Sequence, residues 1–204
     1  MSLGQIKSTA KSGKEFLTVH GEKTNFKLLD FWIWTASDIV SNAIRGKFAE
    51  FIVGTAVGIN FDNVRTEWDA FDLLTPDGKK IEVKSSSYLQ SWCQKKFSSI
   101  LFSIKPARYW DASTNIQEIS PKRHADVYVF CLLKHKVQET LDPLKMEQWD
   151  FYVLPTFKLD LHKKSESSIT LNSLKKLTSS VNYHDLRIEI DNAYHIQQSY
   201  KESD

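Results

Sequence analysis

The order of apolar and polar residues along the chain predicts both helices and strands. The longest apolar run, residues 125–133, is nearly continuous, as in a central strand buried on both faces. A helix is predicted over residues 37–59, with Ser37 as its N-cap and Gly58 as its stop. The other predicted elements are a short helix in 25–34, strands at 64–74, 79–87, 99–104 and 149–154, a helical turn from Pro155-Thr156, and a short helix at 173–177. Helices mixed with strands in one short chain predict an α/β or α+β sheet domain, and we expect the α/β class.

The length of 204 residues predicts a single domain, since domains usually span roughly 100–200 residues. Its core is expected over about 26–190, with the polar segments 1–24 and 197–204 loosely ordered. Hydrophobic residues make up 41% of the chain and charged residues 25%, which is typical of a folded soluble protein. No apolar run approaches the ~18 residues of a membrane helix, and the N-terminus lacks the apolar stretch of a signal peptide. We therefore expect a cytoplasmic protein without membrane contact.

Several kinds of catalytic site are not indicated by the sequence. Cys93 and Cys131 are not at metal-ligand spacing, and their apolar or aromatic surroundings favour buried free thiols. The six histidines are not at zinc-ligand spacing either. There is no nucleophile elbow, and no complete phosphate-binding loop.

A predicted hairpin carries the most informative residues. Thr75-Pro76-Asp77-Gly78-Lys79 fits a three-residue loop, in which a type I turn is followed by a glycine in the left-handed region. Thr75 then pairs with Lys79, which sets Asp72 opposite Glu82 and leaves the small Ala70 opposite Lys84. A two-residue turn would shift the register by one and favour Asp69 instead.

In the favoured register, Asp72, Glu82 and Lys84 converge on one face of the hairpin. Two facing carboxylates destabilise a hairpin unless something neutralises them. A divalent cation would do so, and oxygen ligands suit Mg²⁺ or Mn²⁺. Lys84 would then position a water molecule or stabilise developing negative charge. This set is suited to phosphodiester hydrolysis; the alternative is a surface hairpin whose lysines screen the acids.

A third carboxylate, Glu50, lies within the predicted helix. A helical wheel sets it opposite Phe48 and Ile52, among small and apolar residues that include Gly46 and Gly54. The helix is apolar or small on both sides, which indicates burial, and a buried carboxylate needs a partner. That partner is either a metal site or a salt bridge to an arginine or lysine, with the two glycines leaving space around it.

The net charge of +2 conceals a polarised chain. Residues 79–108 contain seven basic residues and one acid, a net +6, so the remainder carries −4. Polar side chains and Trp92 are interleaved with the bases, as in surfaces that contact phosphates. Gln90, Lys95 and Lys96 are the candidate DNA contacts, and 122–124 is a candidate extension. The alternative is a solvated face.

The hairpin resembles a known pattern. Asp72, nine intervening residues and Glu82-Val83-Lys84 are similar to the PD-(D/E)XK phosphodiesterase superfamily, which has the restriction-endonuclease-like fold. The literal Pro76-Asp77 is interpreted as turn chemistry, and Phe71 stands before Asp72 in place of the motif's proline. Segments 45–50, 82–92 and 149–156 also resemble an uncharacterised bacterial subgroup of that superfamily.

The resemblance implies a mixed sheet of about four to five strands flanked by helices, in the order α-β-β-β-α-β. It implies Asp72 and Glu82 as metal ligands, completed by the Val83 carbonyl, with Glu50 as the additional acid and Lys84 as the catalytic lysine. The implied activity is a Mg²⁺-dependent DNA endonuclease, restriction- or defence-related. A homodimer and a companion methyltransferase are compatible with it.

Two other functions compete with this hypothesis. One is a catalytically silent nucleic-acid-binding protein of the same fold. The other is a protein-interaction subunit, in which the aromatic segment 26–34 forms an interface, although such segments more often belong to a core.

Overall fold

The fold is built on a five-stranded mixed sheet. The computed structural model describes residues 4, 6, 8–65, 69–111, 114–163 and 167–203. The strand order is β11-β9-β8-β4-β3, where β4 runs parallel to β8 and the other neighbours are antiparallel. The bounds are β3 Leu73–Leu74, β4 Lys80–Ser87, β8 Val127–Leu133, β9 Trp149–Pro155 and β11 Ser180–Val181. The predicted α/β fold class, with a mixed sheet and flanking helices, is confirmed.

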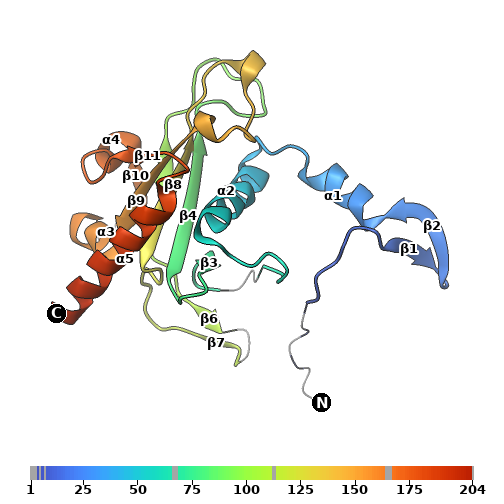
Figure 1. The fold of residues 1–204 in the computed structure, drawn as a ribbon, viewed down its shortest axis with the longest axis horizontal. Helices are drawn as coiled ribbons and strands as arrows, with labels where there is room; N and C mark the ends of the chain where they lie inside the picture. The colour runs from blue at the N-terminus through green and yellow to red at the C-terminus, as the bar shows by residue number, and fades with distance from the viewer. Residues whose placement is uncertain are drawn as a thin grey trace.

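Helices cover both faces of this sheet (Figure 1). On one face, α2 (Asn42–Val57) and α5 (Leu186–Ser203) pack against Ile81, Val83 and the odd-numbered residues of β8. On the other face, α3 (Thr156–Lys163), α4 (Leu171–Leu174) and a two-stranded sheet of β5 (Leu101–Ser103) and β10 (Ser168–Thr170) enclose a second core. All seven residues of β8 are buried, as its continuous apolar run predicts.

The helix predicted over 37–59 starts later than expected. Ser37 is not its N-cap, because Ser37 instead closes α1 (Leu28–Ala36), where its hydroxyl donates to the Ile33 carbonyl. α2 begins only at Asn42. Its end is as predicted: Gly58 adopts φ +76° and donates its N–H to Gly54, a conformation that favours glycine.

The strand predictions between α2 and β8 are correct only in part. Within the predicted strand 64–74, the described residues form a strand only at β3, and residues 66–68 lie outside the described part of the chain. The predicted strand 99–104 forms β5, but β5 pairs with β10 rather than with the large sheet. A small hairpin of β6 (Trp110–Asp111) and β7 (Ile116–Gln117) follows, and the described residues between β5 and β8 include no helix. The short 3₁₀ helices η1 (Gln138–Thr140) and η2 (Met146–Gln148) precede β9.

Both ends of the chain are more ordered than the sequence suggested. β1 (Phe16–Val19) and β2 (Glu22–Lys27) form a hairpin, and with α1 it projects beyond α2, away from the sheet (Figure 1). At the other end, α5 continues to Ser203, past the tail expected to fray from Gln197. Gln197 is buried and accepts a hydrogen bond from the Phe157 N–H, because α5 buries one residue per turn against the sheet.

Two further findings concern general properties. Cys131 is a buried free thiol as predicted, whereas Cys93 is exposed, because it lies in the loop after β4 and not in a core strand. Among the residues that the structure describes, the helices lack the length and apolar character needed to cross a bilayer.

Candidate active site

The β3–β4 turn sets the register that the sequence favoured. Leu73 pairs with Ile81 and Leu74 with Lys80, as a three-residue loop requires. Gly78 adopts φ +87° and donates to the Thr75 carbonyl at 2.9 Å. Asp77 lies at the turn tip, where hydrogen bonds from Lys79 and then Thr75 lower its pKa to about 2. Asp77 therefore stabilises the turn and is not the acid that joins Glu82.

Asp72 lies where the pairing between β3 and β4 ends. Its Oδ2 atom accepts a hydrogen bond from the Val83 N–H at 2.8 Å. The carboxylate thus takes the place of a neighbouring strand at the edge of β4. Asp69, the alternative acid, is exposed and makes no such bond in the described part of the chain. The structure therefore brings Asp72 to the strand that carries Glu82 and Lys84.

Glu82 and Lys84 project from β4 on the face opposite Ile81 and Val83. Lys84 Nζ lies 2.5 Å from Glu82 Oε1, and both side chains are largely buried. Burial raises the pKa of Glu82, and the Asp72 charge raises it further, while Lys84 opposes the shift. A smaller contribution from the Glu50 charge acts in the same direction. Three carboxylates therefore share one electrostatic site with one lysine.

Glu50 reaches the site from α2 and is held by an arginine. Arg65 Nε donates to Glu50 Oε2 at 2.5 Å, and Arg65 Nη2 lies 3.8 Å from Asp72 Oδ1. Burial raises the pKa of Glu50, the hydrogen bond from Arg65 lowers it, and the Asp72 charge raises it. The sequence left open whether a metal or a basic side chain neutralises Glu50. The described contacts show a salt bridge to Arg65. Sequence reasoning missed Arg65 because no spacing pattern links it to Glu50 on the preceding helix.

The loop after α2 positions Arg65. Phe61 packs onto α2 at Gly54, where an added Cβ would lie 2.8 Å from the ring, and its centroid is 4.7 Å from that of Phe51. Gly54 therefore makes room for Phe61, not for Glu50 as the sequence suggested, and a Cβ on Gly46 would meet nothing within 4 Å. The helix is also buried on one side only, since Phe51 is exposed.

Two hollows flank Asp72. The first, of about 440 Å³, lies between α2 and β3 and is mainly apolar. Its polar lining includes Glu50, Arg65 and Asp72, together with Lys47, Asn60, Asn63 and Asp69. The second, of about 290 Å³, is lined by Asp72, Glu82, Arg108, Tyr109, Trp110 and His124. The sequence did not single out Arg108 as a site residue. Only the folding of the loop after β5 brings Arg108 to the hollow that the two acids line.

The donor chemistry suits a hard cation. Asp72 and Glu82 supply carboxylate oxygens, the ligands that Mg²⁺ and Mn²⁺ favour, and the pKa of Glu82 shows that their charges repel. In the described ranges, however, no three His, Cys, Asp or Glu side chains are grouped closely enough to hold a metal. Lys84 and Arg65 instead neutralise the acids.

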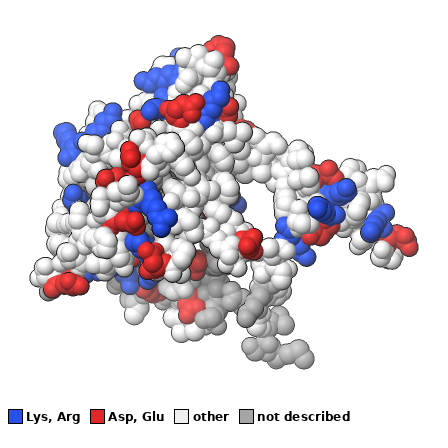
Figure 2. Space-filling model, viewed as in Figure 1, with Lys and Arg blue, Asp and Glu red and all other residues white. Residues whose placement is uncertain are grey.

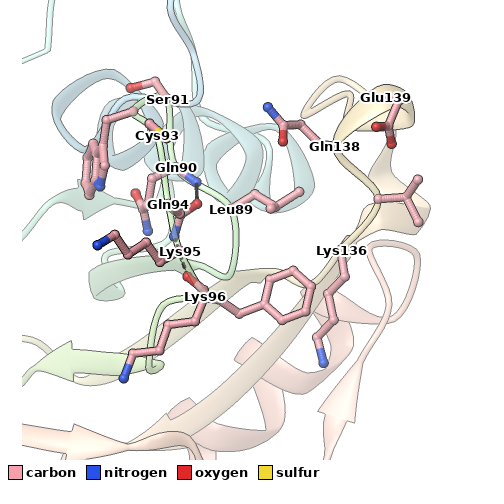
Figure 3. A pocket seen from close by; sticks show the side chains of 13 residues that line it. Leu89, Gln90, Ser91, Cys93, Gln94, Lys95, Lys96, Lys136, Gln138 and Glu139 are labelled. Carbon is pink, nitrogen blue, oxygen red and sulfur yellow. Dashed lines mark hydrogen bonds between the residues drawn. The ribbon is translucent and has the colours of Figure 1, made fainter.

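The candidate DNA contacts line a third hollow beyond the end of β4, of about 890 Å³. Lys95 and Lys96 extend to the same side of the loop (Figure 3). Gln90 lies further in, where its amide bonds Arg45, Ser87 and Ser98. Gln90 therefore holds the loop in place, and the two lysines remain as groups that face solvent.

In the folded chain, acidic partners neutralise part of the positive charge of residues 79–108. Lys79 pairs with Asp77 and Asp191, and Lys84 with Glu82. The expected extension at 122–124 is also neutralised, because Lys122 pairs with Glu118 and the buried Arg123 with Asp160. On the face shown in Figure 2, positive and negative side chains are mixed.

The family comparison indicates that the chain is a nuclease. The family model for bacteriophage T4 endonuclease IV matches residues 22–173, about three quarters of the chain. The chain therefore belongs to the bacteriophage T4 endonuclease IV family. The matched region runs from β2 to α4 and includes Glu50, Asp72, Glu82 and Lys84. No curated protein matches the chain.

Proposed function

We propose that the chain is a metal-dependent endonuclease that hydrolyses DNA phosphodiester bonds at the edge of β4. One observation carries this proposal: Asp72 is bonded to the Val83 N–H, directly beside the Glu82–Lys84 pair. Asp72 and Glu82 would hold Mg²⁺ or Mn²⁺, with the Val83 carbonyl as a further ligand and Glu50 supporting the site. This arrangement supports membership of the PD-(D/E)XK superfamily.

The side chains have separate roles in this proposal. A bound divalent cation would neutralise phosphate charge and lower the pKa of a coordinated water. Glu82 keeps the Lys84 ammonium at the site through their 2.5 Å contact. Lys84 would orient the attacking water and stabilise the charge that develops on the phosphate. Arg65 holds Glu50 beside Asp72, and Arg108 would bind a phosphate oxygen from the other side of the hollow.

DNA is the proposed partner, with Lys95 and Lys96 contacting its backbone and Gln90 supporting their loop. A restriction or defence role, with a companion methyltransferase, and a homodimer that cuts both strands are further parts of the proposal. Because the acids are neutralised by Lys84 and Arg65, the second candidate is a silent DNA-binding protein of the same fold.

Cleavage of plasmid DNA with Mg²⁺ or Mn²⁺ tests the proposal. The wild type should nick or linearise the plasmid, and Asp72→Ala and Lys84→Ala should each reduce the rate at least 100-fold. Asp69→Ala is the matched control, since Asp69 lines the same hollows without bonding β4. Equal rates in the wild type and both site variants would overturn the site. Salt-sensitive DNA binding without cleavage would favour the silent protein.

A further inference from the structure

The N-terminal arm, defined as residues 12–36, presents an unusual amount of apolar surface. None of the residues in β1, β2 or α1 is buried. Nine of its large apolar side chains are between 37% and 83% exposed: Phe16, Leu17, Val19, Phe26, Leu29, Phe31, Trp32, Ile33 and Trp34. The aromatic segment 26–34 is thus not part of the core, and large apolar patches on a soluble protein mark interaction sites.

The arm is nevertheless internally ordered. Leu28 and Leu29 donate their N–H groups to Glu15 and Gly13, at 2.8 and 3.0 Å. Gly13 adopts φ +83°, and an added Cβ would lie 2.9 Å from the Trp32 ring, so the ring seats directly on the backbone. A docking element that is already folded loses little conformational entropy on binding.

Charge and area indicate a protein partner rather than nucleic acid. Residues 12–36 hold three basic and three acidic side chains, a net charge of zero, and both signs show on the arm at the right of Figure 2. At roughly 200 Å² for each fully exposed large side chain, the nine residues present on the order of 900 Å². A standard protein interface buries about 800 Å² on each partner. The arm alone can therefore supply one side of an interface.

The same chain also carries a smaller exposed apolar surface. Phe51, Phe61, Val64 and Leu74 are each about half exposed and line the 440 Å³ hollow between α2 and β3. In its own chain the arm projects away from the sheet (Figure 1), and Asp38 accepts hydrogen bonds from the Val40 and Ser41 N–H groups in the turn between α1 and α2. The folded arm therefore needs another molecule to cover it.

We propose that the arm docks into the α2–β3 hollow of a second copy of this chain, reciprocally, in a two-fold dimer. One isologous exchange pairs the arm of each copy with the hollow of the other. It also brings the partner's arm against the side of the site formed by Glu50 and Arg65. The proposal does not depend on metal-dependent cleavage, since it rests on apolar surface alone.

Sedimentation equilibrium of the full chain tests the dimer. The wild type should be dimeric at micromolar concentration, and the double variant Ile33→Ser/Trp34→Ser should dissociate at least tenfold more readily. Leu74→Ser should weaken the dimer from the receiving side. The matched control is Ile119→Ser/Leu161→Ser, which removes two exposed apolar side chains elsewhere. A monomeric wild type, or an arm variant that dimerises like the wild type, would overturn the proposal.

Cysteine cross-linking tests the docking site. Two variants are made in a Cys93→Ser background, one with Trp34→Cys and one with Leu74→Cys. Each variant is oxidised alone, and a mixture of the two is oxidised in parallel. The proposal expects a disulfide-linked dimer in the mixture alone. A disulfide between two Trp34→Cys chains would show arm-to-arm pairing. A disulfide within a monomer of the double variant Trp34→Cys/Leu74→Cys would show an arm folded onto its own hollow. Either result would overturn the proposal. An arm variant that stays dimeric but loses DNA binding would also overturn the proposal.

Discussion

The carboxylate of Asp72 accepts a 2.8 Å hydrogen bond from the backbone N–H of Val83. This bond joins the hairpin register to the chemistry of the site, because Val83 stands between Glu82 and Lys84. An acid on a loop is thereby fixed to the strand that carries the other two groups, and its charge raises the pKa of Glu82. Asp72 therefore has a structural and an electrostatic role that substitution can separate.

Asp72→Asn and Asp72→Ala should differ in stability and agree in activity. The amide oxygen of asparagine still accepts from Val83 and no longer repels Glu82, so Asp72→Asn should be at least as stable as the wild type. Asp72→Ala leaves the Val83 N–H without this partner and should cost about 1 kcal/mol. Urea unfolding measures the stability, and both variants should lose cleavage. An active Asp72→Asn variant would exclude a metal-binding role for the Asp72 charge.

The pKa of Glu82 should fall when the Asp72 charge is removed. Burial is the largest cause of its raised pKa and the Asp72 charge the next. Carboxyl NMR titration of metal-free protein should therefore show a lower Glu82 pKa in Asp72→Asn than in the wild type, while Asp69→Asn leaves it unchanged. The same pKa in all three proteins would show that the two acids do not interact.

The raised pKa of Glu82 also predicts a pH dependence of stability. Its folded pKa lies above the unfolded value, so the folded state binds the proton more readily, and the stability from this group is present at low pH. That stability is lost as the pH rises from the unfolded pKa through the folded one. Glu82→Gln should therefore gain stability relative to the wild type between pH 4 and pH 8. Urea unfolding at both pH values measures this, and a constant difference would contradict it.

The sequence predicts those parts of the site that local chemistry determines. Pro76-Asp77-Gly78 fixes a turn, the turn fixes the register, and the register selects Asp72 over Asp69. The nearly continuous apolar run of residues 125–133 likewise predicts β8. Each of these inferences uses interactions within a few residues or between directly paired strands.

The sequence does not predict the groups that tertiary packing delivers. Arg65 contacts Glu50 from the loop after α2, whose Phe61 packs on Gly54. Arg108 lines the hollow beside Asp72 and Glu82 from the loop after β5. Neither placement leaves a spacing pattern. The aromatic arm shows the same limit in another way, since apolar composition predicts burial without saying whether the covering surface lies in the same chain.

Lys84→Ala should separate metal binding from catalysis. The variant keeps the carboxylates of Asp72 and Glu82, so Mn²⁺ binding, measured by calorimetry, should persist. Cleavage should fall about 10²–10³-fold, as when a group that stabilises transition-state charge is lost. Lys134→Ala is the control, because Lys134 contacts Asp150 at 2.7 Å in a comparable pair outside the site. Loss of Mn²⁺ binding in Lys84→Ala would instead make the lysine a structural part of the site.

Arg65→Ala should tighten Mn²⁺ binding severalfold at pH 8. Arg65 contacts both Glu50 and Asp72 and so competes with any cation for these carboxylates. The same change removes the hydrogen bond that lowers the pKa of Glu50, so Glu50 should hold its proton at higher pH and the gain in affinity should disappear on acidification. The exposed Arg187→Ala serves as control. Weaker Mn²⁺ binding across the pH range would show that Arg65 shapes the site rather than competing for it.

Arg108→Ala should lower the cleavage rate without changing Mn²⁺ affinity. Arg108 lines the hollow that contains Asp72 and Glu82, and a guanidinium there can bind phosphate oxygens in a bidentate manner. Removing it should reduce kcat about 10–100-fold, and Arg108→Lys should restore part of the loss because it keeps the charge but not the fork. Lys105→Ala, an exposed cation from the same loop, should cleave normally. Comparing kcat and KM on one oligonucleotide distinguishes the roles: a change confined to KM would make Arg108 a general DNA contact and not a contact at the reacting phosphate.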